Sequence, residues 1–276
     1  MNGELKITII GAGHGGKAMA ADLAIRGHAV RLYNRTYENI QTIAARGGIE
    51  LELETGSQEL GPIHTVTDDM ARALDGAHLI MVVVPASGHR DIAEACAPHL
   101  VDGQIVVLNP GRTGGALEFR HVLAEAGCTA EIIIAETETF LFASRSNGPA
   151  QAQIFRRKNT VPLAALPSTH TQTVLDVLQE VYPQFIAAQN VLHTSLNNMG
   201  AVFHPALVLL NAGWIEATGG DFEFYIDGVT PSTALILERL DRERVTVATA
   251  MGIRAQTACE WLSRAYSAHG NNLFEA

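Results

Sequence analysis

Apolar residues fall into short continuous runs in the first half of the chain. The runs at 7–10, 79–84, 105–108 and 132–135 are almost purely aliphatic, which is typical of parallel strands buried on both faces. Further strands are expected at 28–33, 161–166 and 185–188, with helical stretches at 17–24, 37–47, 88–97, 115–126 and 170–180. This alternation predicts an α/β fold with a doubly wound parallel sheet of the Rossmann type.

A helical period replaces this pattern near residue 190. The apolar stretches at 199–215, 232–251 and 255–266 show no strand-like alternation, so they predict helices. We therefore expect two domains, a sheet domain over 1–190 and an all-helical domain over 191–276. A substrate site between two such domains would be usual for this architecture.

A glycine turn follows the first strand directly. It has the GxGxxG spacing between a strand and a helix: Gly11 permits the tight turn, Gly13 admits a pyrophosphate, and Gly16 allows the helix to pack closely. This context predicts a dinucleotide site at the helix N-terminus. The expected cofactor contacts are Gly11, Ala12, Gly13, His14, Gly15, Gly16, Asn34, Arg35, Thr36 and Pro85.

The end of the second strand bears on the choice of cofactor. NAD-binding sheets usually carry an acidic residue there for the ribose 2′-hydroxyl, whereas this chain has Asn34-Arg35-Thr36. A guanidinium can bind a 2′-phosphate with charge-assisted hydrogen bonds. We expect NADP to be preferred and NAD to be the alternative, since Arg35 could also be an ordinary solvent-facing residue.

Composition restricts the class of ligand. The 276 residues carry 19 basic and 29 acidic side chains, a net charge of −10, which speaks against nucleic acid or an anionic membrane as partner. Three cysteines without CxxC spacing favour neither a zinc site nor a disulfide framework. The first strand begins close to Met1 and no apolar run is long enough to span a bilayer, so a cytoplasmic location is expected.

Two loops are expected to face the reactive end of the cofactor, Val84–His89 and Asn109–Gly115. Arg112 in the second loop could meet a substrate carboxylate or be an exposed loop arginine. For His14 and His89 a structural or surface role is favoured over a functional one.

His204 is the candidate acid/base in the helical half. It precedes Pro205 in an apolar stretch, so the helix should kink or restart there. An imidazole titrates near neutrality and can give and take protons, although a core histidine is the alternative. Asn197 would lie on roughly the same helical face and Asn198 away from it. Either amide could bind substrate or serve as a cap or core contact.

Several segments resemble the opine dehydrogenase family, also called the octopine and nopaline dehydrogenase family. The resemblance runs over nearly the whole chain and is carried by the glycine turn and by the segments 108–119, 190–195, 204–213, 224–232 and 241–244. It implies an NAD(P)H-dependent reductive condensation of an α-keto acid, commonly pyruvate, with the amine of an amino acid. His204 matches the family's catalytic histidine. Asn198 is a second catalytic candidate, and Arg112 and Thr230 are candidate substrate contacts.

The chain departs from the family pattern at two places. Family members continue beyond Ala276, where they supply an aspartate that orients the histidine, with an arginine nearby, and no residue here matches either. Gly200 stands where the family often has an asparagine. We therefore expect either a helical domain truncated relative to the family or another acidic residue in place of the family's aspartate. A truncated domain would expose an apolar face, which makes a homodimer one expectation.

Two other functions stay open on these residues. A single-substrate 2-keto or 3-hydroxy acid reductase would usually need a lysine base, and no lysine occurs from residue 190 onward. A catalytically impaired NADP-binding protein is the other alternative, which the missing family segment favours.

Overall fold

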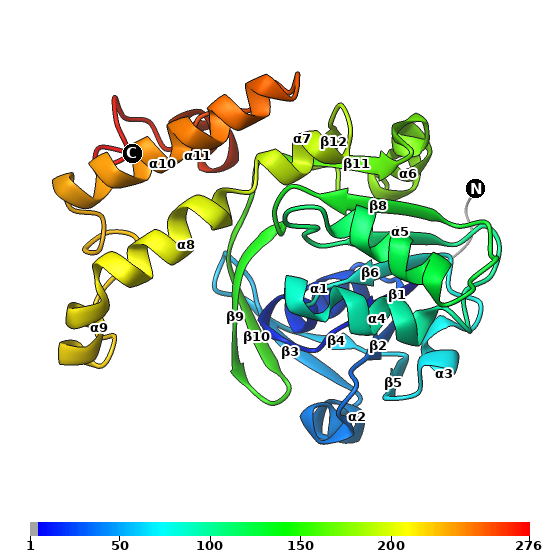
Figure 1. Cartoon of the computed structure of the whole chain (residues 1–276). Coiled ribbons are helices and arrows are strands. Elements are labelled where there is room, and N and C mark those ends of the chain that lie inside the picture. Colours follow the sequence, from blue (N-terminus) through cyan, green and yellow to red (C-terminus); the bar gives the residue numbers. More distant parts are fainter. Residues whose placement is uncertain (1–4) are drawn as a thin grey trace. The chain divides into compact units, whose positions relative to one another are not determined.

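A computed structural model describes residues 5–276 and divides the chain into two compact units, Met1–Val191 and Leu192–Ala276. Among the described residues, the first unit contains an eight-stranded sheet in the order β12-β11-β8-β7-β6-β1-β2-β5 (Figure 1). The neighbouring strands are parallel except at the β8–β11 pair. The strands are β1 (Lys6–Ile10), β2 (Ala29–Tyr33), β5 (Thr65–Thr67), β6 (Leu79–Val82), β7 (Ile105–Leu108), β8 (Ile133–Thr137), β11 (Val161–Leu166) and β12 (Phe185–Ala187).

Helices cover both faces of this sheet, which confirms the doubly wound prediction. Residues of α1 (His14–Ile25) and α6 (Thr171–Leu178) share one buried cluster with the sheet. Residues of α3 (Met70–Leu74), α4 (His89–Cys96) and α5 (Gly115–Glu125) share a second cluster with it. The aliphatic runs of the central strands are buried along their full length, as strands covered on two faces must be.

The predicted helix at 37–47 is shorter than expected. A 3₁₀ turn η1 (Tyr37–Asn39) precedes α2 (Gln41–Arg46), because Ile40 between them has a non-helical backbone. The helix ends as predicted at Gly47, whose φ of +72° is the left-handed conformation of a glycine C-cap.

A second sheet lies against α1 and was not predicted. It has the order β4-β3-β10-β9, with β3 (Gly48–Glu52), β4 (Gln58–Pro62), β9 (Phe142–Gly148) and β10 (Gln151–Arg157). Its close approach to the helix requires Gly61, since a Cβ there would lie 2.6 Å from the Cα of Ala21. Helix α1 is therefore packed between two sheets, and this position holds the glycine turn at its start.

A buried ion pair ties the second sheet to α1. Asp22 of α1 accepts a hydrogen bond from Arg157 Nη2 at 2.8 Å and another from Arg26 Nε at 2.9 Å. The Asp22 side chain is only 5% exposed and that of Arg157 is 15% exposed. The Arg157 guanidinium also lies 5.0 Å from the centre of the Phe142 ring. The same group therefore makes both an ion pair and a cation–π contact.

The second unit is helical from Leu192 to Ala276 and contains no strand in that range. Its helices are α7 (Val191–Leu196), which begins at the unit boundary, α8 (Met199–Leu210), α9 (Ala212–Thr218), α10 (Pro231–Ala250) and α11 (Ala258–Tyr266). Of the two outcomes expected at Pro205, a kink or a restart, the restart is wrong, since α8 runs through this residue. A proline removes one backbone hydrogen bond, which a helix can lose without ending there.

The described residues include no group of histidine, cysteine, aspartate or glutamate side chains suited to a metal ion. No helix within 5–276 combines the length and apolar character that crossing a membrane requires. Of the three cysteine thiols, Cys96 is buried, and Cys128 and Cys259 are half-buried.

Candidate cofactor and active site

The glycine turn is built by close backbone contacts. Gly11 has a φ of +107°, and a Cβ there would lie 2.4 Å from the carbonyl oxygen of Val83. A Cβ on Gly16 would lie 1.8 Å from the carbonyl oxygen of Gly11. A Cβ on Gly13, in contrast, would meet nothing within 4 Å. Two glycines therefore serve packing, while the third leaves open space at the start of α1, where helix N–H groups favour an anion.

A cavity of about 370 Å³ adjoins this turn, and we call it the cofactor pocket. It is formed by the ends of β1, β2 and β6, at the edge of the sheet where dinucleotides bind in such folds. Its lining residues are Ile10, Gly11, Ala12, Gly13, Tyr33, Asn34, Arg35, Thr36, Asn39, Val83, Val84, Pro85, Ser87, Gly88, Asp91 and Ile92. The structure thus brings together seven of the ten predicted cofactor contacts, all but His14, Gly15 and Gly16.

Asn34 connects two walls of the cofactor pocket. Its Oδ1 accepts a hydrogen bond from the backbone N–H of Ala12 at 3.3 Å, and its Nδ2 donates to the carbonyl of Thr36 at 2.9 Å. The backbone N–H of Gly11 also donates to the carbonyl of Tyr33 at 2.8 Å. The residue that stands in the usual acidic position therefore fixes the shape of the pocket.

The three predicted contacts that do not line the pocket contact other parts of the first unit. His14 Nδ1 accepts a hydrogen bond from the backbone N–H of Ser146 at 2.9 Å. Gly15 lies under the Phe140 ring, because a Cβ there would be 2.8 Å from Phe140 Cε1. Lys17, one turn on, donates to Ser146 Oγ at 3.1 Å, and burial lowers its pKa.

Arg35 is paired across the cofactor pocket. Its Nη1 lies 3.2 Å from Oδ2 of Asp91, in the first turn of α4. The sequence prediction missed Asp91, since a single acidic residue in an amphipathic helix carries no local signal. Ser87 and Gly88 were also missed, although they belong to a loop that the sequence pointed to.

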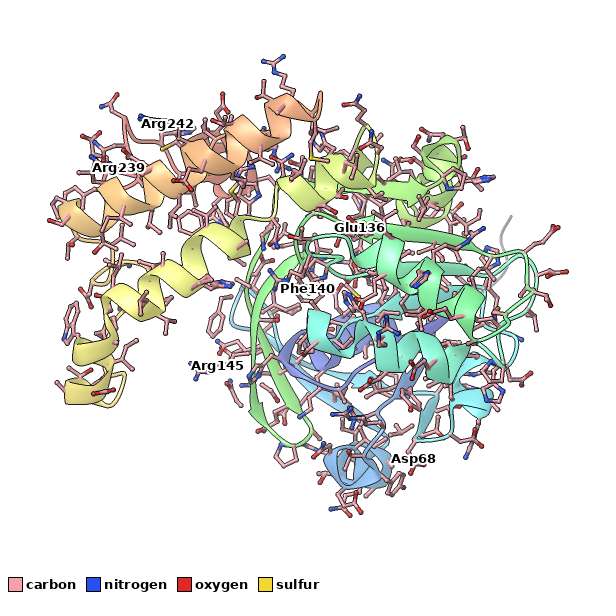
Figure 2. All side chains as sticks on the ribbon, in the orientation of Figure 1. Asp68, Glu136, Phe140, Arg145, Arg239 and Arg242 are labelled. Carbon is pink, nitrogen blue, oxygen red and sulfur yellow. The ribbon has the colours of Figure 1, made fainter. Side chains whose placement is uncertain are left out.

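Glu136 supports the second predicted loop. Its Oε2 accepts a hydrogen bond at 2.8 Å from the backbone N–H of Ala116, at the start of α5. The Asn109–Gly115 loop passes so close to the Glu136 side chain that a Cβ on Gly111 would lie 2.4 Å from the same oxygen. Arg112 in this loop is half-buried and has a φ of +62°. Glu136 and Phe140 are labelled in Figure 2; no sequence signal identified either.

Two titratable side chains are buried near these loops. His89 is 1% exposed, and neither ring nitrogen has a hydrogen-bond partner among the described residues. Burial lowers the pKa of His89, so its ring is uncharged. Lys158 donates from Nζ to the carbonyl of Phe140 at 2.8 Å, and burial lowers its pKa to about 8, with the Arg112 charge acting in the same direction.

His204 lies exposed on α8 in the second unit, with its ring centre 6.2 Å from that of Tyr225. The prediction that Asn197 shares a helical face with it is wrong, because α8 begins only at Met199. Asn197 instead donates to the carbonyl of His193 at 2.9 Å and accepts from the N–H of Gln256 at 2.9 Å. The first bond holds the α7–α8 connection to α7, and the second joins it to the segment before α11.

The other two candidates in this unit lie at helix starts. Asn198 is buried at the N-cap position of α8, without a side-chain cap bond. Thr230 is the N-cap of α10, where its Oγ1 accepts from the backbone N–H of Thr233 at 3.3 Å. Its hydroxyl also shares a 2.9 Å hydrogen bond with that of Thr233, which gives Thr230 a capping role.

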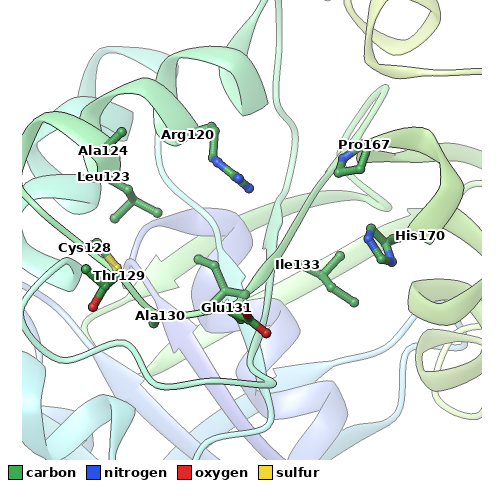
Figure 3. Close-up of a pocket in the computed structure, with 11 residues that line it drawn as sticks. Arg120, Leu123, Ala124, Cys128, Thr129, Ala130, Glu131, Ile133, Pro167 and His170 are labelled. Carbon is green, nitrogen blue, oxygen red and sulfur yellow. The ribbon is translucent and has the colours of Figure 1, made fainter.

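A larger cavity of about 560 Å³ lies near the amino end of β8. Arg120 and His170 stand on two sides of it (Figure 3). None of the predicted site residues lines this cavity, and the glycine turn is at the other end of the strands. The cofactor pocket is therefore the nucleotide candidate in spite of its smaller volume.

Comparison with known proteins agrees with this division of the chain. Residues 187–276 match the model of the alpha-helical domain of NAD/NADP octopine/nopaline dehydrogenase, and residues 6–132 match that of the NAD-dependent glycerol-3-phosphate dehydrogenase N-terminus. The opine dehydrogenase of Arthrobacter sp. (strain 1C) is 39% identical over 270 residues, which cover 97% of this chain and 74% of the relative.

Solved structures share the fold at lower identity. An octopine dehydrogenase with NADH and L-arginine has a TM-score of 0.77 and 21% identity, over 98% of this chain and 73% of that chain. A yersinopine dehydrogenase with bound NADP+ has a TM-score of 0.72 and 18% identity, over 94% and 67% of the two chains.

Proposed function

This chain belongs to the opine dehydrogenase family, and we propose on that basis that it reduces the imine formed between an α-keto acid and the amine of an amino acid. The product is an N-carboxyalkyl amino acid. The observation that carries the proposal is the 39% identity over 97% of the chain to an opine dehydrogenase. Pyruvate and an amino acid are the substrates to test first, since solved octopine dehydrogenase structures include one with L-arginine and one with pyruvate.

The first unit fits a nicotinamide dinucleotide. The open space at Gly13 accommodates a pyrophosphate that a side chain would displace, and the cofactor pocket adjoins it. When bound, the cofactor supplies the hydride that reduces the imine. The protein's own part is to hold the phosphates at the start of α1 and the ribose between Asn34 and Arg35.

His204 is our candidate general acid/base. When the amine adds to the keto carbon, the carbonyl oxygen must leave as water, and an imidazole can donate the proton that this departure needs. The same ring, when neutral, can first take up a proton from the substrate's ammonium group, which frees the amine lone pair for attack on the keto carbon. Its exposure on α8 leaves it accessible to a substrate. Asn198 and Arg112 are the companion candidates, for hydrogen bonding and for a substrate carboxylate.

The chemistry itself is tested by following NADPH oxidation with pyruvate across a panel of amino acids. Opine synthesis requires a rate that depends on both organic substrates. Turnover with a keto acid alone would favour a single-substrate reductase. Cofactor binding without any turnover would favour a catalytically impaired NADP-binding protein.

Arg35 supports a preference for NADPH over NADH, because it is the only cationic side chain among the described residues that line the cofactor pocket. The family's neighbours include structures with either cofactor. The Michaelis constant for NADPH should be the lower one, and Arg35→Ala should narrow the difference. Equal Michaelis constants for NADPH and NADH, unchanged in Arg35→Ala, would contradict the proposed preference for NADPH.

A homodimer is the second part of the proposal. The helical unit exposes large apolar side chains, with Leu209 77% and Ile226 69% exposed, and such faces usually mark an interface. Light scattering on the purified protein tests it, since a dimer has twice the mass of the 29.6 kDa chain. The cytoplasmic location stays a prediction that cell fractionation would check.

A further inference from the structure

Arg35 and Asp91 face each other across the cofactor pocket. Arg35 follows β2 and Asp91 lies in the first turn of α4, so the two come from opposite walls. Their Nη1 and Oδ2 atoms are 3.2 Å apart. They are the only charged residues among the described residues that line this pocket. Any charge that a ligand brings to this end of the pocket therefore meets one cation and one anion together.

The pair is open to rearrangement. The side chains of Arg35 and Asp91 are 73% and 60% exposed, and neither makes another hydrogen bond within the described part of the chain. Exposed pairs of this kind contribute little to stability. An anionic ligand group can consequently replace Asp91 as the partner of the Arg35 guanidinium at little cost in protein stability. The Asp91 carboxylate and the ligand anion then compete for the same guanidinium.

We propose that Asp91 is a specificity-determining residue that weakens the preference for a 2′-phosphorylated dinucleotide. A 2′-phosphate bound by Arg35 would lie near the Asp91 carboxylate, and the two negative charges repel each other. An unphosphorylated ribose carries no such charge, so Asp91 acts on one cofactor and leaves the other almost unaffected. The pocket thereby accepts both NADPH and NADH. This inference rests on the proposed function only in taking the pocket to be a dinucleotide site.

The size of the effect follows from Coulomb's law. A phosphate of charge about −1.5 at roughly 7 Å from a carboxylate in a water-like dielectric is destabilised enough to change a dissociation constant by about fivefold. The charges are exposed, so salt should reduce the effect. Removal of the carboxylate charge should therefore strengthen NADPH binding selectively, and mainly at low ionic strength.

The test is to measure dissociation constants for NADPH and NADH by calorimetry, with no organic substrate present. Asp91→Asn should lower the constant for NADPH by about fivefold at low salt and change that for NADH by less than about twofold. Glu94→Gln is the matched control, because it makes the same charge change on α4 but lies outside the pocket and pairs with Arg90. It should leave both constants unchanged.

A double variant separates charge competition from a general effect of the substitution. In an Arg35→Gln background the Asp91→Asn change should no longer improve NADPH binding more than twofold, because the guanidinium that holds the 2′-phosphate close to the Asp91 carboxylate is gone. The proposal is overturned if the ratio of the two constants stays the same in Asp91→Asn, or if Glu94→Gln shifts it equally. Since binding alone is measured, these results do not depend on whether the protein makes opines.

Discussion

Gly16 lies so close to Gly11 that a Cβ on Gly16 would sit 1.8 Å from the Gly11 carbonyl oxygen. Real atoms do not approach to that distance. A Cβ is fixed rigidly to the backbone and the carbonyl oxygen belongs to it, so neither atom can rotate away, and the turn or α1 would have to move. We expect Gly16→Ala to lower the thermal midpoint and to raise the dissociation constant for NADPH together. Thermal unfolding and cofactor titration on the same preparation would measure both.

Gly13→Ala is the control for that variant, because the added methyl meets nothing within 4 Å and the backbone at Gly13 has an ordinary φ of −75°. It should unfold at the wild-type temperature and still bind NADPH at least tenfold more weakly, since the methyl would occupy the space left for phosphate. Equal thermal losses in both variants would contradict the assignment of separate roles.

His204→Ala should reduce opine-forming turnover by at least about a hundredfold, because general acid/base catalysis typically contributes 10²–10⁴-fold. The dissociation constant for NADPH should change by less than about twofold. The control is His269→Ala, which removes another exposed imidazole of the same unit, one hydrogen-bonded to Ser263. Turnover that survives in His204→Ala would exclude His204 from the mechanism.

Asp22→Asn should lower the free energy of unfolding by about 3 kcal/mol, because it leaves the buried Arg157 guanidinium with only the more distant and more exposed Glu54 carboxylate, 4.0 Å away. The exposed Arg90–Glu118 pair, with atoms 3.7 Å apart, supplies the comparison. Glu118→Gln should cost less than about 0.5 kcal/mol. Urea unfolding of the two variants measures both values, and similar losses would mean that burial does not control the strength of these pairs.

Lys158 should make stability depend on alkaline pH. Its pKa is lowered from 10.5 to about 8 by burial, so between these values the unfolded chain binds more protons than the folded one. The contribution of Lys158 to the free energy of unfolding must therefore rise as pH increases from about 8 to 10.5. The shift corresponds to a change of roughly 3 kcal/mol.

Lys158→Met is the variant that tests this. The difference in unfolding free energy between wild type and variant, measured in urea at several pH values, should move in favour of wild type as pH rises through that range. The lost hydrogen bond to Phe140 adds only a constant offset. A difference that does not vary with pH would show that Lys158 titrates normally in the folded protein.

The parallel sheet could be predicted because its strands are short aliphatic runs between turn residues. The second sheet was missed. Residues 49–52 of β3 do alternate between apolar and polar side chains, but β4 is mostly exposed, and β10 begins with Gln151, whose partner in β3 is Glu50. That pairing depends on the chain folding back over about a hundred residues, which leaves no local pattern. Long-range contact therefore decided the part of the fold that sequence reasoning missed.

The residues of the candidate site also fall into two groups, those that local spacing identified and those that only long-range contacts bring to the site. The glycine turn and Arg35 stand at fixed offsets from a strand, so the spacing identified them. Asp91 and Glu136 reach the site from elements far along the chain, and each looks like an ordinary acidic residue in its own segment. Asn197 was misplaced because α7 ends at Leu196 and α8 begins at Met199, so Asn197 lies between two helices and does not share a helix with His204.

The hairpin of β9 and β10 reaches the first turn of α1 through Ser146, which bonds both His14 and Lys17. The helix start is thus held in place before any phosphate arrives, and binding need not order it. Less conformational entropy is lost on binding to a turn that is already rigid. Cofactor affinity should therefore respond to substitutions in the hairpin, outside the cofactor pocket, through the mobility of the turn alone.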